Sequence, residues 1–320
     1  MWFAALTALL TKDWVDNILR SWPIIVVDWV LFVFLLLIVV FAYPTLRSEN
    51  HNTFEHMHRW AGWASIAVFW AEVMLFVNVL AGIHHKSYGL TLVAFPAFWM
   101  LLVTTCLIIL PWLRLRKLYM QPEALSDHCV RMHFTEPMNP FVVHRIAETP
   151  LGEWHPFACL PNPEGPGGSI IVSKAGDFTA RTIANPRPYY WVRGIPTTGV
   201  MGMVQLFKSA VIVTTGSGIG PCLGFVVDMD TKCRMLWSTP NPALTFGQHV
   251  IDDVKAIDKD AIIWDTKKNG RPDMVELAYQ LYIQSGAEAV FVLSNSKLTR
   301  KVVYGMESRG VPAFGPIWDS

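Results

Sequence analysis

The 320-residue sequence has few cysteines, almost no net charge, and no repeats or low-complexity tracts. Its 5 cysteines form no CxxC pair and no zinc-type spacing, so no metal site is expected from them. The thiols are predicted to stay reduced and to face a cytosol. The 26 Lys and Arg residues balance 25 Asp and Glu residues without forming a basic stripe. That balance argues against a nucleic-acid partner.

Hydrophobic residues are abundant, at 52% of the chain, and they are concentrated in its first third. Residues 24–43, 63–82 and 90–112 are nearly uncharged runs of about 20 residues, the length with which a helix crosses a bilayer. Residues 120–320 have the charge content of a globular protein. The sequence therefore predicts a multidomain integral membrane protein, with about three transmembrane helices within residues 1–120 and the lipid bilayer as a partner.

The basic residues after the third apolar run predict the orientation of the chain. Arg114, Arg116 and Lys117 follow that run directly, and positively charged flanks stay on the cytosolic side. Counting back, the 44–62 loop is also cytosolic. The C-terminal module is therefore expected in the cytosol, and residues 2–22 are expected to form a short interfacial helix or the remnant of a further span.

The rest of the chain predicts two kinds of sheet. Residues 121–200 alternate short β-rich runs with Pro and Gly, which is typical of a small antiparallel β-barrel. Residues 201–320 alternate strands and helices, which indicates an α/β domain with a parallel sheet covered on both faces. The strongest local signal in this part is 216-GSGIGP-221, because glycines after a strand let the backbone approach a pyrophosphate.

Four motifs in this order resemble the ferredoxin-NADP reductase superfamily, and within it the ferric reductase and NADPH oxidase branch. They are 154-WHPFA-158, 173-SKAGDFTARTI-183, 214-TTGSGIGP-221 and 269-NGRPDM-274. The resemblance covers roughly residues 125–320 and implies an FAD-binding-like barrel followed by an NAD(P)-binding-like domain. The whole chain looks like haemless fungal and plant integral membrane proteins with such a C-terminal module, which is also found fused to adenylate-forming reductases.

The resemblance implies a role for each matching residue on the flavin side. His155, Pro156 and Phe157 would lie against the isoalloxazine ring of FAD. Gly176 and Thr179 would offer donors to the FAD phosphates at a helix N-terminus, where negative charge is favoured.

On the nucleotide side, the resemblance implies a turn that binds the pyrophosphate of NAD(P)H. Gly216, Gly218, Gly220 and Pro221 would form that turn, and Trp318 would stack on the flavin face that receives the nicotinamide. No catalytic residue is predicted, and no metal ligand.

The sequence also departs from the family pattern. Ala158 stands where a Ser or Thr hydroxyl is expected, and 194-GIPTTG-199 replaces the usual turn between the two domains. The segment 237-WSTPNP-242 lacks the arginine that typically binds a 2′-phosphate, so a preference for NADPH over NADH has no support. The late strand ends in 293-LSNS-296 instead of a cysteine-glycine pair.

The stretch 58-HRWAGWASIAVFWAE-72 resembles a haem-binding helix of the same branch, in which two histidines stand 13 or 14 residues apart. Here those positions are Ala71 and Glu72, so an intrinsic haem is not expected. The neighbouring His51 and His56 are interpreted as solvated interfacial residues. Buried carboxyl groups in a membrane are costly, and Glu72 is interpreted as a polar contact between helices or as part of a proton path.

Two hypotheses follow. The first is a membrane-anchored oxidoreductase-like protein without intrinsic haem, which transfers hydride from NAD(P)H to FAD and on to an unknown acceptor. The alternative is a non-catalytic regulatory or signalling membrane protein with a degenerate reductase fold. An oligomer that supplies further helices stays open.

Overall fold

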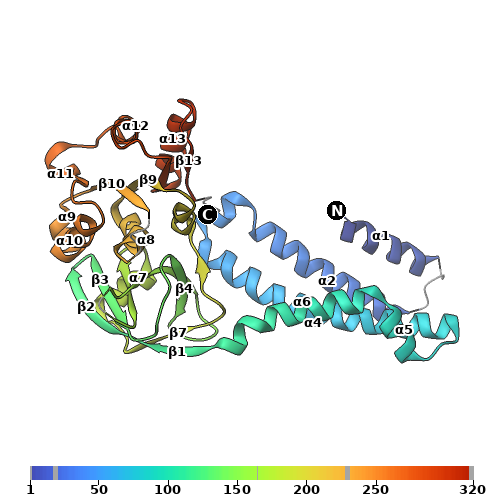
Figure 1. The fold of residues 1–320 in the computed structure, drawn as a ribbon. Coiled ribbons are helices and arrows are strands. Elements are labelled where there is room, and N and C mark those ends of the chain that lie inside the picture. Colours follow the sequence, from blue (N-terminus) through green and yellow to red (C-terminus); the bar gives the residue numbers. More distant parts are fainter. Residues whose placement is uncertain (1, 17–20, 164, 228–230, 317–320) are drawn as a thin grey trace. The chain divides into compact units, whose positions relative to one another are not determined.

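The computed structural model describes residues 2–16, 21–163, 165–227 and 231–316. The chain divides into two compact units between Leu110 and Pro111 (Figure 1). We call them the helical unit and the two-sheet unit. The predicted Trp318 lies outside the described residues.

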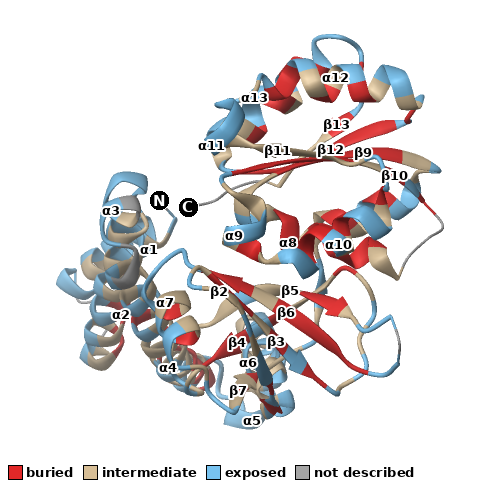
Figure 2. Cartoon of the chain, turned by 90° about the vertical axis from the view of Figure 1, so that its left-hand side faces the viewer, coloured by how far each residue is buried: buried red, intermediate tan, exposed pale blue. Residues whose placement is uncertain are grey.

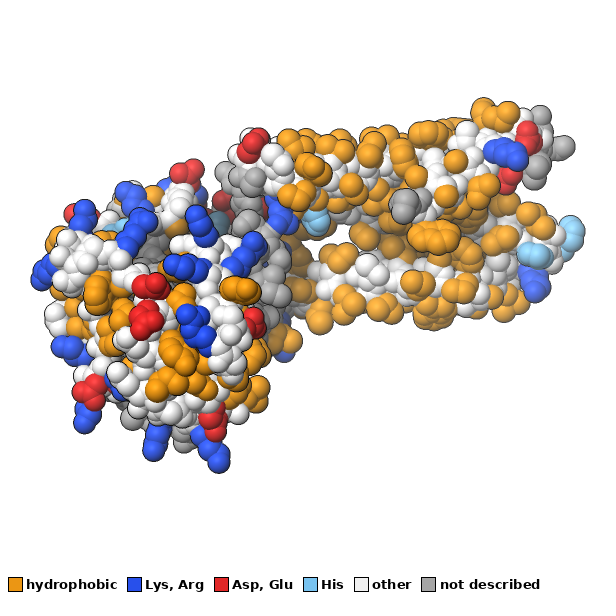
Figure 3. Space-filling view, turned by 90° about the horizontal axis from the view of Figure 1, so that it is seen from above, with side chains coloured by type: hydrophobic (Ala, Val, Ile, Leu, Met, Phe, Trp, Pro, Cys, Tyr) orange, Lys and Arg blue, Asp and Glu red, His pale blue; other side chains and the backbone are white. Residues whose placement is uncertain are grey.

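The helical unit consists of apolar helices whose side chains face outward over most of its surface (Figure 3). Its helices are α1 (Trp2–Val15), α2 (Trp22–Phe41), α3 (Pro44–Glu49), α4 (His51–His84), α5 (Tyr88–Ala94) and α6 (Pro96–Ile109). Three stretches are long and apolar enough to cross a membrane, namely Trp22–Phe41, Thr53–His84 and Pro96–Arg114. The predicted membrane region is therefore helical as expected, while its place in a bilayer stays a prediction.

Two details of this unit differ from the sequence prediction. Residues 44–62 are not a loop, because α3 and the first turns of α4 occupy them. The third apolar run is broken at Phe95, which has an extended backbone (φ −89°, ψ 111°). Pro96 explains the break, since a proline disfavours the helical conformation of the residue before it.

Four polar side chains are buried among the described residues of the helical unit, and one of them is Ser65 of α4, which is 3% exposed. Thr7, Asp28 and Glu72 are 2%, 1% and 6% exposed, and they come from α1, α2 and α4. Thr7 and Glu72 are the polar neighbours of Asp28. This agrees with Glu72 as a contact between helices and leaves the proton-path reading untested.

The first half of the two-sheet unit is an antiparallel sheet. Its strands are β1 (Arg116–Tyr119), β2 (Gln121–Ser126), β3 (Cys129–Phe134), β4 (Val142–Ala147), β5 (His155–Pro161), β6 (Gly168–Ser173), β7 (Tyr189–Val192) and β8 (Thr197–Thr198). Their order is β1-β7-β4-β5-β6-β3-β2, with β8 on β4. The described strands form a half-barrel with edges at β1 and β2, so the expected barrel is not closed. It also begins before residue 121, because β1 pairs with β7.

The second half confirms the predicted parallel α/β sheet. Its strands are β9 (Ser209–Thr215), β10 (Lys232–Thr239), β11 (Ile262–Asp265), β12 (Ala289–Leu293) and β13 (Ala313–Phe314), in the order β11-β10-β9-β12-β13. Helices α8 (Ile219–Cys222), α9 (Pro242–Phe246) and α10 (Gln248–Ile257) cover one face. Helices α12 (Met274–Ser285) and α13 (Ser296–Glu307) cover the other (Figure 2). Successive side chains of β9 point to opposite faces of the sheet. Ile212 packs in the cluster that includes α10, and Val211 packs in the cluster that includes α12.

One hydrophobic cluster contains residues of both sheets, in addition to the half-barrel's own core. Phe141, before β4, packs on Phe225, after α8, with ring centroids 4.5 Å apart. Cys129 and Leu160 from the half-barrel belong to the same cluster as Trp237 from the α/β sheet. The boundary predicted between residues 200 and 201 lies between two sheets that are joined by this cluster, and it stays a prediction.

Candidate nucleotide-binding site

The strand order of the parallel sheet reverses between β9 and β12. β9 pairs with β10 on one side and with β12 on the other, all in parallel. In open α/β sheets ligands bind outside the carboxyl ends of the strands at such a reversal. The glycine loop that follows Thr215 leaves the sheet at this point.

Gly216 and Gly218 shape this loop in different ways. Gly216 has a positive φ of 50°, which glycine adopts without strain, and a Cβ there would meet nothing within 4 Å. Its carbonyl oxygen accepts a hydrogen bond from Nε1 of Trp237 at 3.0 Å. A Cβ on Gly218 would lie 2.7 Å from the carbonyl oxygen of Leu293 and 2.6 Å from Oγ1 of Thr214. Only glycine therefore lets the loop lie against the end of β12.

Gly220 and Pro221 are less constrained. The atom nearest to a Cβ on Gly220 would be Cβ of Ile171, at 4.0 Å. Pro221 lies within α8, which ends at Cys222 and continues as a 3-10 turn, Leu223–Val226. A helix this short has a small dipole, so an anion at the loop would depend on backbone N–H groups more than on the helix end expected from the sequence.

Hydroxyl groups line the carboxyl edge of the sheet, and the sequence prediction missed them. Thr214 donates to the carbonyl oxygen of Leu293 at 2.9 Å, and the hydroxyls of Thr215 and Ser294 are hydrogen-bonded to each other. Oγ1 of Thr239 is buried and has no hydrogen-bond partner among the described residues. The available signal was Ser or Thr at the ends of the first, second and fourth predicted strands of this sheet, in 214-TT-215, 238-ST-239 and Ser294.

Two lysines stand next to this edge. β10 and β11 pair in parallel with Thr239 opposite Asp265, so the chain leaves both strands at the same edge. Asp265 caps the short helix Thr266–Asn269 by accepting from the N–H of Lys267 at 2.9 Å. Lys267 and Lys268 are exposed on that helix. They place positive charge one strand away from the segment in which the sequence lacks an arginine.

The predicted flavin residues lie on the half-barrel. His155 stacks on Phe178 with ring centroids 4.0 Å apart and an interplanar angle of 24°, and Phe157 lies 6.2 Å from the same ring. Phe178 is buried, whereas the His155 side chain is 32% exposed and Pro156 is exposed. The buried ring of Phe178, which the sequence prediction did not single out, thus stacks on the imidazole of His155.

Gly176 and Thr179 begin helix α7 (Asp177–Ala184). Oγ1 of Thr179 accepts from the N–H groups of Ala175 and Gly176, at 2.8 and 2.9 Å, and donates to the carbonyl oxygen of Gly176. The threonine therefore holds the shape of the loop, and its hydroxyl proton is already used. A Cβ on Gly176 would meet nothing within 4 Å, and residues 174–177 are exposed, so this corner is open to solvent.

The two predicted sites are neighbours. β6 contains Ile171, the residue nearest to Gly220, and its chain runs directly into the loop at residues 174–176. Helix α8, which follows the glycine loop, therefore lies next to β6, the strand that leads into the loop before α7.

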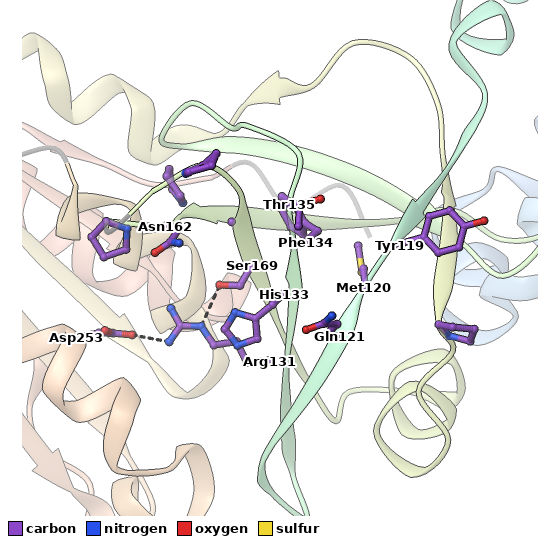
Figure 4. A pocket seen from close by; sticks show the side chains of 15 residues that line it. Tyr119, Met120, Gln121, Arg131, His133, Phe134, Thr135, Asn162, Ser169 and Asp253 are labelled. Carbon is purple, nitrogen blue, oxygen red and sulfur yellow. Dashed lines mark hydrogen bonds and ion pairs between the residues drawn. The ribbon is translucent and has the colours of Figure 1, made fainter.

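A separate cavity of about 740 Å³ lies on the outer face of β3 (Figure 4). Arg131 crosses it and joins β3 to β6 and to helix α10, with Nε donating to Oγ of Ser169 at 2.9 Å and Nη1 donating to Oδ2 of Asp253 at 3.0 Å. His133 points into the same space. None of the described residues predicted to bind a cofactor lines this cavity.

No group of three or more His, Cys, Asp or Glu side chains with the geometry of a metal site occurs within the described ranges. In the helical unit His58 is exposed and Glu72 is buried, although both belong to α4. The two positions differ in burial, and the expectation that the chain binds no haem stays a prediction.

The family model "Adenylate-forming reductase 03009, C-terminal domain" matches residues 200–320. Two curated proteins of Coprinopsis cinerea match the whole chain, adenylate-forming reductase 03009 at 45% identity and adenylate-forming reductase 06235 at 43%. The chain spans 31% of the length of each.

A solved structure matches the two-sheet architecture. The ferredoxin NADP+ reductase from Neisseria gonorrhoeae with bound FAD and NADP has a TM-score of 0.51 at 11% identity, over 63% of this chain and 98% of that chain. At this identity the likeness shows the fold alone. The chain is therefore similar over its whole length to about a third of each of two adenylate-forming reductases, and its two sheets have the ferredoxin-NADP reductase-like fold.

Proposed function

We propose that the chain is a membrane-anchored, flavin-dependent oxidoreductase module that takes hydride from NAD(P)H and passes electrons to a separate acceptor, without a haem of its own. The observation that carries the proposal is the close approach of Gly218 to Leu293, because it places a bare glycine backbone at the strand reversal. The word reductase in the names of both relatives supports the same reaction class. Because the chain spans 31% of those relatives, their complete activities are not carried over.

In this proposal the α/β sheet binds the dinucleotide. Gly216 and Gly218 let the pyrophosphate approach the loop backbone, and Trp237 holds the loop in place by its hydrogen bond to the Gly216 carbonyl oxygen. The hydroxyls of Thr215 and Ser294 lie at the carboxyl edge, where they can hydrogen-bond to a ribose or an amide. Lys267 and Lys268 supply charge for a 2′-phosphate.

The half-barrel would hold the flavin. When bound, FAD supplies the ring that accepts hydride. Gly176 leaves space for its phosphates, and Thr179 has a positioning role because it closes the loop around Ala175 and Gly176. His155 and Phe157, supported by Phe178, offer an aromatic surface for the ring.

The helical unit would anchor this module. Its three apolar stretches have the length of membrane spans, and Arg114, Arg116 and Lys117 favour a cytosolic two-sheet unit. Electrons would then reach an acceptor in the cytosol or in the membrane itself.

One observation favours the non-catalytic alternative. Two hydroxyls that would contact flavin are missing or engaged, since β5 has Ala158 opposite Val143 and Thr179 is bonded to its own loop. A module that binds nucleotide but no flavin would sense the nucleotide without transferring hydride.

The test is the visible spectrum of the full chain purified in detergent. An enzyme shows flavin absorption that is lost on anaerobic addition of NADPH or NADH and returns with an oxidant. A colourless protein that takes up no added FAD contradicts the enzymatic proposal. If such a protein still binds NADP+ in calorimetry, the regulatory alternative is supported.

A further inference from the structure

Five aromatic side chains and two cations line one side of the chain directly after the last apolar helix. We call this set the β1–β7 aromatic face, and it consists of Trp112, Tyr119, Trp154, Tyr189, Trp191, Lys117 and Arg193. None of these residues belongs to the proposed nucleotide or flavin site.

The strand register puts the first part of this set on one face. β1 and β7 are antiparallel, with Lys117 opposite Trp191 and Tyr119 opposite Tyr189. The intervening Leu118 is buried in the half-barrel core, so these four side chains point outward. The Lys117 ammonium lies 4.3 Å from the centre of the Tyr189 ring and 5.4 Å from that of Trp191.

The second part of the set continues the same side of β7. Arg193 follows Tyr189 and Trp191 at steps of two residues, so it leaves the strand on their side. Its guanidinium lies between two indoles, 4.5 Å from the ring of Trp112 and 4.3 Å from that of Trp154. The two indoles meet edge to face, 6.5 Å apart.

This face is tied directly to the end of a candidate membrane span. The span Pro96–Arg114 includes Trp112, and the N–H of Gly194 donates to the carbonyl oxygen of Pro111 at 2.9 Å. Lys117 follows Arg114 by three residues, which is at most about 10 Å of extended chain. If the span crosses a bilayer, the β1–β7 aromatic face therefore begins in the headgroup region.

Large apolar side chains on the face and next to it are exposed on the protein surface. Leu113, Tyr119 and Ile195 are 75%, 67% and 62% exposed. The carboxylates nearby are engaged, since Arg116 binds Glu136 through two nitrogens and Glu153 lies 3.5 Å from the His155 ring. The face therefore combines exposed apolar groups with positive charge.

We propose that the β1–β7 aromatic face rests on the headgroup surface of the bilayer, and so fixes the orientation of the two-sheet unit on the membrane. Trp and Tyr are favoured in this region because their rings are apolar and their N–H or O–H groups can reach water. Lys117 of this face, and the exposed Arg114 at the end of the span, would lie near anionic headgroups, whose attraction falls off within about 8 Å at physiological salt. This inference rests on the membrane anchoring of the proposed function.

The test uses a fluorescent bimane label on the full chain, reconstituted in vesicles of equal parts phosphatidylcholine and phosphatidylglycerol. The background is Cys106→Ser, because the other four cysteines are buried. Tyr119→Cys reports on the face and Val33→Cys, in α2, reports on anchoring. Leu244→Cys, 75% exposed in α9, is the control for a water-facing apolar site. Quenching is measured with phosphatidylcholine brominated high on the acyl chain.

We expect roughly twofold quenching at positions 119 and 33 and none at 244. Quenching at 33 without quenching at 119 overturns the docking of the face but leaves the anchor intact. Absence of quenching at 33 contradicts the anchored function itself. Disulfide-linked dimers of Tyr119→Cys would assign the face to a second copy of the chain and also overturn the lipid proposal.

Discussion

Trp237 and Gly216 connect two neighbouring strands at the point where the proposed dinucleotide lies. The indole Nε1 of Trp237 donates to the carbonyl oxygen of Gly216 at 3.0 Å, and the indole itself is fully buried against Phe246. Gly216 has a positive φ, so this bond fixes a backbone conformation that few other residues adopt. A side chain of the core therefore sets the shape of the glycine loop.

Replacement of this indole should weaken both the fold and the loop. Trp237→Phe leaves the Gly216 carbonyl oxygen without its donor, and we expect the free energy of unfolding to fall by about 1–3 kcal/mol. NADH affinity should fall as well, while flavin content stays unchanged. Denaturant titration and calorimetry measure the two effects.

The matched control is Trp264→Phe. Trp264 donates to the carbonyl oxygen of Gly270 at 2.9 Å, the same kind of bond, but at an exposed turn where water can replace the donor. Its stability loss should be smaller. Equal losses in the two variants would contradict the role given to burial at Trp237.

Adding a methyl group at Gly218 and at Gly220 should have different effects on nucleotide binding. In Gly218→Ala the methyl would lie 2.7 Å from the Leu293 carbonyl oxygen, so the loop must shift and NAD(P)H affinity should drop by about tenfold or more. In Gly220→Ala the nearest atom is 4.0 Å away and the residue is helical, so stability should be unchanged or higher by up to about 1 kcal/mol. The NAD(P)H affinity of both variants is measured by titration, after their flavin spectra have been checked. Equal affinities would contradict the claim that Gly218 must stay glycine for the loop to bind nucleotide.

Removal of two lysines should distinguish the two pyridine nucleotides. In Lys267→Ala/Lys268→Ala we expect the KM for NADPH to rise by about three- to tenfold, since two cations near a phosphate are lost, with the KM for NADH unchanged. Lys259→Ala is the control, because this exposed lysine lies between α10 and β11 at the opposite edge of the sheet. An equal change for both nucleotides would show that the lysines do not read the 2′-phosphate.

The N-terminus of α12 predicts a pH-dependent contribution to stability. Asp273 accepts from the N–H groups of Val275 and Glu276, at 2.9 and 3.3 Å. The N–H groups of Glu276 and Val275 lower its pKa below the ordinary value. The charged cap therefore stabilises the fold above the ordinary pKa of about 4, and the effect is lost as the pH falls through the lowered value.

Substitution separates the charge from the cap. Asp273→Asn keeps a capping side chain and should be less stable than the wild type near neutral pH but equal to it in acid. Asp273→Ala removes the cap and should cost about 1 kcal/mol at neutral pH. Denaturation midpoints across the pH range measure both, and a difference between Asp and Asn that persists in acid would contradict the assignment.

Local features of the chain were predicted well because they depend on neighbours in sequence. The apolar runs produce helices, the β-branched run before Gly216 produces β9, and the alternation of strands and helices produces the parallel sheet. Asp273 caps α12 because the donors it bonds are two and three residues away. The break at Phe95 was missed, although Pro96 is an equally local signal.

Contacts between distant residues were decided only by the tertiary structure. The sequence by itself determined the membrane-length helices, the glycine turn and the class of each sheet, because periodicity and backbone preference act over a few residues. The structure alone joined Phe141 to Phe225 in one core, placed Phe178 behind His155, and brought Gly218 against Leu293. The two residues of each pair are separated by 23 to 84 positions in the sequence. They meet because the burial of apolar side chains brings distant segments together, which local sequence patterns do not reveal.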